Sequence, residues 1–186
     1  QQCIDSVRAM ATAFNEHTQR AFIPGHFCCV DESMVVWTPP TAPAWIYVKR
    51  KPHPEGAEFH TAACAKTKII FHMELVEGKR STHVPEFDSS FPTTVALLLR
   101  MTKSIWGSGR VVQLDSGFGS IQGALELFKK KLYTCIIMKK KRYWPRGVPG
   151  DYLKAQFKDQ PLGYKGAFRG VHSEYPDVPF NLCVFR

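Results

Sequence analysis

Several features that would assign this chain to a common class are missing from its sequence. No stretch approaches the roughly 18 uninterrupted apolar residues of a membrane span, and the first residues lack the basic and then apolar order of a signal peptide. There is also no Gly-x-Ser-x-Gly element and no phosphate-binding P-loop. The sequence therefore predicts neither a membrane helix, nor a serine hydrolase, nor a P-loop nucleotide hydrolase.

The cysteines and histidines form no pattern typical of a metal site or a disulfide framework. No pair of the 6 cysteines has C-x-x-C spacing, and no His-Glu-x-x-His motif occurs among the 7 histidines. The cysteines that lie in apolar, strand-like runs are Cys28, Cys29, Cys135 and Cys183. We therefore expect buried thiols of a reducing compartment, and no cysteine nucleophile with a histidine base.

Acidic residues are scarce relative to basic ones. The chain has 16 Asp and Glu against 25 Lys and Arg, which gives a formal charge of +9. Such a charge suggests an anionic partner, and nucleic acid is favoured over a membrane because no basic amphipathic helix dominates. A basic soluble protein without such a partner is an equal alternative on charge alone.

What the sequence does contain is a clear succession of helical and strand-like patterns. Apolar residues at helical spacing predict a first helix over 4–22, which Pro24 and Gly25 end. Ser120 is expected to cap a later helix. The further strands are expected at 27–36, 45–48, 58–64, 68–76, 111–115 and 133–138, and the further helices at 93–105 and 121–131.

This element order is that of a ribonuclease-H-like fold. We expect an α/β domain whose mixed sheet has antiparallel strands 1–3 followed by parallel strands, flanked by helices. The expected divisions are a helical lead-in over 1–25, a partial core over 26–140, and a loop-rich insertion over 141–186 with a terminal strand at 180–185. Because the chain starts without Met and ends on a strand, we expect it to be a truncated piece of a longer protein.

Two apolar runs lead into an aspartate, the first into Asp31 and the second into Asp115. In a ribonuclease-H-like fold one acid lies on the first strand and another just after the fourth, and these residues occupy those places. Such carboxylates bridge two divalent metals roughly 3.5–4 Å apart and act on phosphodiesters. On the pattern alone, an alternative remains equally open, in which Asp115 forms a turn before Gly117 and Asp31 is an edge residue.

Motifs around these aspartates, together with others along the chain, resemble piggyBac transposases and the domesticated proteins derived from them. The resemblance extends over about residues 10 to 150. The segments that carry it are 14–16 through Phe22, 24–25, 30–35, 51–56, 114–118 with 120–121, and the basic stretch that leads to 146–149.

The resemblance implies a DDD transposase core in which Asp31 is the first catalytic, metal-binding aspartate and Asp115 the second. It also implies Mg²⁺ or Mn²⁺ as cofactor, transposon-end DNA as partner, a homodimer of the full-length protein, and a nuclear location. No residue matches the family's third aspartate, and the segments 36–40 and 116–117 depart from the family pattern. We therefore expect DNA cleavage and transfer activity to be missing, and a domesticated, non-catalytic DNA-binding or chromatin protein is the alternative.

Basic residues cluster in two places that we expect to contact DNA. The tract 129–146 contains eight Lys or Arg and no acid, and aromatic residues are interleaved with them. A solvated helix end or an import signal would have the same composition. The predicted DNA-binding residues are Lys49, Arg50, Lys51, Lys129, Lys130, Lys139, Lys140, Lys141, Arg142 and Arg146.

A third interpretation rests on the segment 114–120. It is similar to the D-x-G-x-G turn of S-adenosylmethionine-dependent methyltransferases, where an acid at the end of the following strand binds the ribose. Here that strand ends in lysines, and the third glycine position is Ser120. The methyltransferase interpretation therefore ranks below the other two.

Overall fold

The computed structural model describes residues 2–36, 44–77, 83–139, 144, 148, 150–159, 161, 165–172 and 175–185. They form two compact units, Gln1–Ile137 and Met138–Arg186. The elements of the first unit are α1 (Gln2–Ala21), β1 (Phe27–Val36), β2 (Trp45–Tyr47), β3 (Glu55–Cys64), β4 (Ile70–Leu75), α2 (Thr93–Thr102), the 3-10 helix η1 (Lys103–Ile105), β5 (Val111–Leu114), α3 (Ile121–Lys129) and β6 (Tyr133–Ile136). Those of the second are α4 (Gly150–Lys158), β7 (Lys165–His172) and β8 (Tyr175–Phe185).

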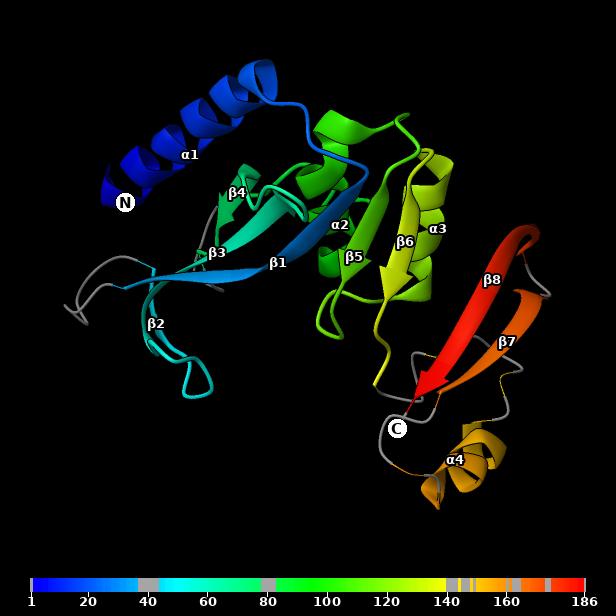
Figure 1. Cartoon of the computed structure of the whole chain (residues 1–186). Helices are drawn as coiled ribbons and strands as arrows, with labels where there is room; N and C mark the ends of the chain where they lie inside the picture. Colours follow the sequence, from blue (N-terminus) through cyan, green and yellow to red (C-terminus); the bar gives the residue numbers. More distant parts are fainter. Residues whose placement is uncertain are drawn as a thin grey trace. The chain divides into compact units, whose positions relative to one another are not determined.

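The strands of the first unit form one mixed sheet (Figure 1). β1 lies near its centre, antiparallel to β3 on one side and parallel to β5 on the other, and β6 extends the parallel part. β2 and β4 both pair with β3 along its other edge. The antiparallel strands thus precede the parallel ones, and the mixed α/β fold predicted from the sequence is confirmed.

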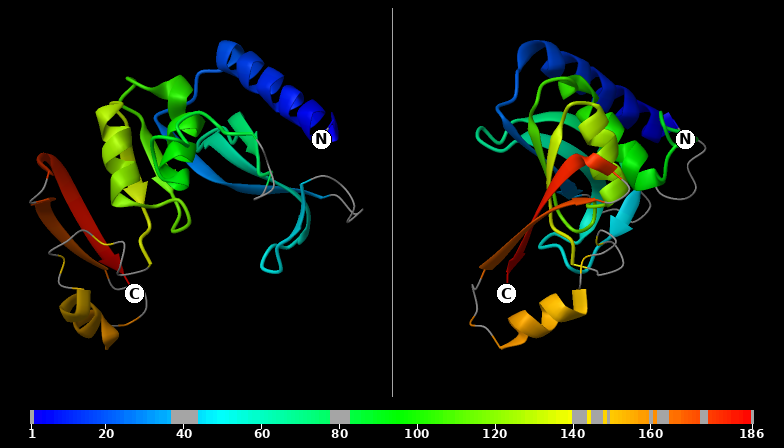
Figure 2. Two further views of the ribbon diagram at one scale, coloured as in Figure 1. Left: turned by 180° about the vertical axis from the view of Figure 1, so that it is seen from behind. Right: turned by 90° about the vertical axis from the view of Figure 1, so that its right-hand side faces the viewer.

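One face of the sheet carries the core. Alternate residues of β1, Cys28 and Val30, are 1% and 2% exposed, and their partners on β5, Val112 and Leu114, are 0% and 3% exposed. α2 and α3 cover this face and pack against each other, with Leu98 of α2 fully buried between them and the strands (Figure 2). Since successive side chains of a strand alternate, the residue after Val30 points to the opposite face.

The helices and β6 end slightly earlier than their apolar patterns predicted. α2 stops at Thr102, whose hydroxyl donates to the carbonyl oxygen of Leu98 over 2.7 Å, and η1 follows it. α3 stops at Lys129, and Lys131 adopts a left-handed conformation with φ of 58°, which is a common way to end a helix. β6 ends at Ile136. Buried apolar residues continue past the first two of these ends, at Ile105 and Leu132, whereas Ile137 after β6 is exposed.

The helix predicted at the start of the chain covers the outer edge of β4. The side chain of Asn15 pairs with both backbone groups of Met73: its Nδ2 donates to the carbonyl oxygen over 2.9 Å, and its Oδ1 accepts from the N–H over 2.8 Å. Nearer the start of α1, the guanidinium of Arg8 donates to both carboxylate oxygens of Glu77. α1 therefore takes the place of a further strand at an edge that would otherwise expose backbone groups.

We expect Asn15→Ala to lower the free energy of unfolding by about 1–3 kcal/mol, because both backbone groups of Met73 lose a part-buried partner. Urea denaturation followed by circular dichroism measures the change. The matched control is Glu16→Ala, which removes the next side chain and only an exposed 3.7 Å ion pair with Arg20. Equal effects of the two substitutions would contradict a specific role for Asn15.

The second unit contains more regular structure than its sequence predicted. Instead of one strand at 180–185, an eleven-residue β8 pairs antiparallel with β7, and α4 precedes them. The first half of β8 was not predicted because it contains Pro176 and Pro179, and proline is unfavourable in most strands. A two-stranded ladder has only edge strands, however, and edge strands tolerate proline.

No helix that the structure describes is long and apolar enough to cross a bilayer.

Candidate functional site

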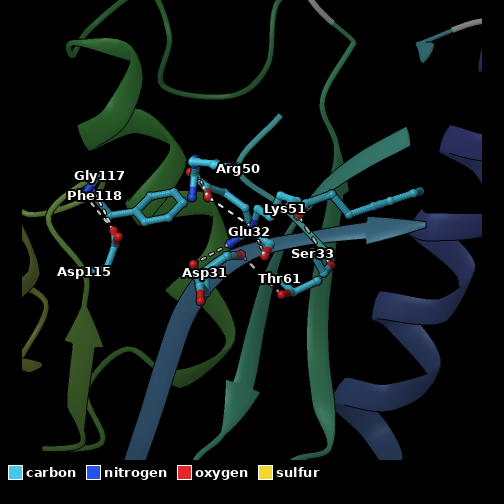
Figure 3. Close-up of polar contacts among 10 residues, drawn as sticks. Asp31, Glu32, Ser33, Arg50, Lys51, Thr61, Asp115, Gly117 and Phe118 are labelled. Carbon is cyan, nitrogen blue, oxygen red and sulfur yellow. Dashed lines mark hydrogen bonds and ion pairs between the residues drawn. The ribbon is translucent and has the colours of Figure 1, made fainter. Parts of the chain in front are cut away.

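Asp31 and Asp115 lie at the same point of two neighbouring parallel strands. The last pair between β1 and β5 joins Val30 to Leu114, and each aspartate is the next residue along the sequence. Neighbouring strands lie about 4.8 Å apart, so the sheet brings the two backbone segments side by side. Both aspartates are exposed, Asp31 on β1 and Asp115 just beyond the end of β5 (Figure 3). Their predicted places in the fold are confirmed, while their role as metal ligands stays a prediction.

Asp115 closes a tight turn between β5 and α3. Its Oδ1 accepts hydrogen bonds from the N–H groups of Gly117 and Phe118 over 2.6 and 3.3 Å, and its carbonyl oxygen accepts from the N–H of Gly119 over 2.9 Å. Phe118 is 4% exposed and packs edge-to-face on His60, with ring centroids 5.6 Å apart. Asp115 is therefore a turn former, and the same hydrogen bonds hold its carboxylate in place, as metal-ligating carboxylates require.

Asp31 is fixed through the strand rather than through a turn. Its Oδ1 accepts from the N–H of Glu32 over 2.8 Å, and its carbonyl oxygen accepts from the hydroxyl of Thr61 on β3 over 3.2 Å. Its backbone pairs with Thr61 of β3, one residue beyond the last pair between β1 and β5. The carboxylate stays on the exposed face that α2 and α3 leave uncovered.

The side chain of Glu32 binds the turn between β2 and β3. Its Oε2 accepts from Nη2 of Arg50 over 2.9 Å and lies 3.5 Å from Nζ of Lys51. The same Nζ donates to the carbonyl oxygen of Glu32 over 3.1 Å. Figure 3 shows both cationic side chains turned onto Glu32. Two of the cations predicted to contact DNA therefore lie beside β1, close to the aspartates.

The basic residues of the turn between β2 and β3 also interact electrostatically with Asp115 and Glu58. The hydrogen bond with Glu32 raises the pKa of Arg50, and attraction to Glu58 and Asp115 adds to the increase. Burial raises the pKa of Glu58, as does the negative charge of Glu32, whereas Lys51 and Arg50 lower it. The sequence did not identify Glu58 because its place near Glu32 depends on the register between β1 and β3.

The donor atoms at Asp31 and Asp115 suit a hard divalent cation. Mg²⁺ prefers oxygen ligands and is commonly bound by one or two carboxylates together with water and substrate phosphates. Within the described part of the chain, no group of three or more His, Cys, Asp or Glu side chains is placed to hold a metal ion. The two aspartates therefore fit Mg²⁺ or Mn²⁺ as part of a larger ligand set.

The predicted basic tract does not form one surface within the described residues. α3 starts beside the Asp115 turn and leads back to the opposite end of the parallel strands, where β6 begins (Figure 1). Lys129 and Lys130 lie at that far end. Lys129 pairs with Glu126 over 2.7 Å, and Nζ of Lys130 lies 4.4 Å from the ring centroid of Trp106. These two lysines are thus separated from the aspartates by the length of the helix.

The other predicted DNA-binding cations have different positions. Lys49 is exposed in the same turn as Arg50 and Lys51, and Lys139 is exposed at the start of the second unit. Four predicted residues lie outside the described residues, namely Lys140, Lys141, Arg142 and Arg146. Arg50 and Lys51 are therefore the predicted cations that the structure places beside the candidate site.

A large groove lies elsewhere in the first unit. This groove of about 810 Å³ runs between α1, β4 and α2, and His72, Glu74 and Arg100 contribute to its lining. Neither Asp31 nor Asp115 lines it. Two exposed carboxylates outside this groove suit a polymeric substrate better than an enclosed small molecule.

This strand order, with one carboxylate on the first strand and another after the first parallel crossover strand, is that of a ribonuclease-H-like core. The sequence model of the family described as Transposase IS4 matches residues 1–172. The chain belongs to this transposase family. Membership favours the transposase interpretation of segment 114–120 over the methyltransferase interpretation. A comparison with curated proteins finds no match.

A solved structure supports the same fold. The cryo-EM structure of a piggyBac transposase synaptic complex with hairpin DNA is similar to this chain with a TM-score of 0.65 and 18% sequence identity. The similarity covers 91% of this chain and 35% of that one, so the chain spans about a third of that transposase. At this identity the likeness shows the fold alone, and it confirms the ribonuclease-H-like class predicted from the sequence.

Proposed function

We propose that the chain carries two metal ligands and part of the DNA-contacting surface of a transposase active site. The observation that carries this proposal is the placement of Asp31 and Asp115 directly after the last pair between the parallel strands β1 and β5, in a member of a transposase family. The similar piggyBac structure is a complex with hairpin DNA, which supports DNA as the partner.

In the proposed site, Asp31 and Asp115 would hold Mg²⁺ or Mn²⁺ where the pairing between β1 and β5 ends. When bound, such ions activate the attacking oxygen and stabilise the leaving oxygen of a phosphodiester, first in strand cleavage and then in strand transfer. The Asp115 turn keeps one carboxylate oriented before any ligand arrives. Arg50 and Lys51 supply positive charge for the phosphates on either side of the reacting one.

Two aspartates do not complete a DDD site, and we infer that cleavage depends on a third carboxylate. Asp151 and Asp159 belong to the second unit, and neither follows a strand of the first sheet. The chain by itself is therefore proposed to bind a divalent ion weakly and to cut DNA poorly or not at all. This incomplete ligand set also favours the second candidate function, a DNA-binding protein of transposase origin without catalysis.

The metal proposal is tested by titrating the chain with Mn²⁺ and following the free ion by electron paramagnetic resonance. We expect Asp31→Asn and Asp115→Asn each to lower the Mn²⁺ affinity by about tenfold or more, because each removes a charged ligand. The matched control is Asp159→Asn, an exposed aspartate of the second unit, which should leave the affinity unchanged. Equal Mn²⁺ binding by all four proteins would refute the metal site.

A nicking assay on terminal-repeat DNA separates the two candidate functions. Metal-dependent cleavage that Asp31→Asn abolishes would show a catalytic transposase core. DNA binding that falls steeply with salt, without cleavage at any metal concentration, would show the non-catalytic alternative.

A further inference from the structure

Glu32 joins three segments at the candidate site. It lies on β1 directly after Asp31, and its carboxylate binds the cations of the turn between β2 and β3. Its Oε1 lies 3.7 Å from the point where a Cβ on Gly117 would be, so the carboxylate also borders the Asp115 turn. A single side chain therefore connects the first acid's strand, the basic turn and the second acid's turn.

We infer that Glu32 is a positioning residue that holds Arg50 and Lys51 beside the two aspartates, where they receive the phosphates next to the bound phosphodiester. This inference rests on the proposed function and adds to it the device that aligns the DNA backbone. Glu32 itself is assigned no contact with metal or DNA.

The contacts of Glu32 explain why it binds Arg50 and Lys51 rather than a metal ion. Oε2 already interacts with two positive groups, and the backbone carbonyl oxygen takes a further hydrogen bond from Lys51. A carboxylate neutralised by two cations is a poor third ligand for the aspartates.

Holding these cations has a physical benefit for binding a phosphate. A free Lys or Arg side chain loses rotamer entropy when binding fixes it in one conformation. Lys51 is already ordered, because its side chain is 18% exposed and touches Glu32 at two points. Arg50 is 68% exposed, so its guanidinium remains reachable for DNA while Glu32 restricts its position.

A merely structural role for Glu32 makes a different prediction. An exposed ion pair such as that with Arg50 contributes little to stability, so its loss should leave the fold intact. On simple electrostatics, removing a negative charge from a DNA-binding surface should strengthen DNA binding. On the positioning inference it should weaken binding, because the two cations lose their alignment. The sign of the change therefore distinguishes the two explanations.

The experiment is a double-mutant cycle read out by fluorescence anisotropy with a labelled duplex of terminal-repeat DNA at several salt concentrations. We expect Arg50→Gln to lower DNA affinity roughly five- to tenfold near 0.1 M salt and to reduce the salt slope by about one. Glu32→Gln alone should lower the affinity in the same direction. In the Arg50→Gln, Lys51→Gln background, Glu32→Gln should no longer weaken binding.

Matched controls separate this effect from a general change of charge. Glu126→Gln removes an acid that pairs with Lys129 at the far end of α3, and it should leave DNA affinity unchanged or raise it. Lys66→Gln removes one positive charge from the turn at the other end of β3 and should have little effect. A thermal melt of each variant verifies that it is folded.

The outcomes distinguish this inference from the proposed function. If Glu32→Gln raises DNA affinity, or weakens it equally with and without Arg50 and Lys51, the positioning role is wrong, whatever the Mn²⁺ titrations show. Absence of measurable DNA binding by the unaltered chain would also overturn it. If Asp31→Asn and Asp115→Asn leave Mn²⁺ binding unchanged, the metal proposal fails, while the cycle still reports on the basic turn.

Discussion

Gly119→Ala will displace the turn that carries Asp115 and weaken metal binding without touching either aspartate. A Cβ at this position would lie 2.2 Å from Cγ2 of Ile136 and 3.1 and 3.3 Å from the carbonyl oxygens of Asp115 and Ile137. The Ile136 side chain can rotate, but the two carbonyl groups belong to the backbone. The turn must therefore move away from β6, and the carboxylate of Asp115 moves with it.

We expect this overpacking to lower the free energy of unfolding by about 1–3 kcal/mol and to reduce Mn²⁺ affinity at the same time. Urea denaturation and the Mn²⁺ titration measure the two effects. Gly25→Ala is the matched control, because its Cβ would lie 3.5 Å from Sγ of Cys64, an ordinary contact distance. Unchanged Mn²⁺ binding by a folded Gly119→Ala variant would show that the position of the Asp115 turn does not matter for the metal.

The parts of the fold that the sequence predicted are those set by local pattern. Alternating burial marks β1, and Ser120 caps α3 by accepting from the N–H of Gly123 over 3.0 Å, as expected. The adjacency of Asp31 and Asp115 also follows from local signals, because each acid comes directly after an apolar strand segment. Because β1 and β5 are parallel neighbours, the two aspartates follow the same pair of residues, Val30 and Leu114.

Contacts between distant segments could not be predicted in this way. The pairing of Glu32 with Arg50 and Lys51 depends on how a hairpin turn folds back over β1, and no local pattern encodes it. The pairing of Asn15 with Met73 likewise depends on the docking of α1 along β4. In both cases the residue types were visible in the sequence, but their partners were not.

The basic tract shows a second limit of sequence reasoning. The tract was expected to contact DNA together with the turn at 49–51, yet α3 separates the first lysines of the tract from the Asp115 turn. A helix of 9 residues is roughly 13 Å long, which is enough to carry Lys129 and Lys130 away from the Asp115 turn. The cations that lie near the aspartates are therefore Arg50 and Lys51, although they are remote from Asp115 in sequence.

The largest loss of stability is expected from Arg100→Met. The guanidinium of Arg100 donates to both carboxylate oxygens of Glu74 on β4 over 2.7 and 2.8 Å, and also to Asp88 and to the carbonyl oxygen of Glu86. Its side chain is 10% exposed, and the exposed fractions of Glu74 and Asp88 are 26% and 24%. One side chain thus ties α2 to the sheet and to the segment that precedes α2.

Removing one member of such a network leaves charged groups partly buried without a partner, which typically costs about 3–5 kcal/mol. We expect Arg100→Met to lower the free energy of unfolding by about that amount in urea denaturation, and Arg100→Lys to recover only part of it, because an ammonium cannot reproduce the two parallel hydrogen bonds to Glu74. The control is Lys103→Met, one turn further along, whose ion pair with Glu86 is about half exposed on both sides, with values of 52% and 51%. That pair should contribute less than about 1 kcal/mol. A similar loss of unfolding free energy in Arg100→Met and Lys103→Met would therefore contradict the role that we assign to burial.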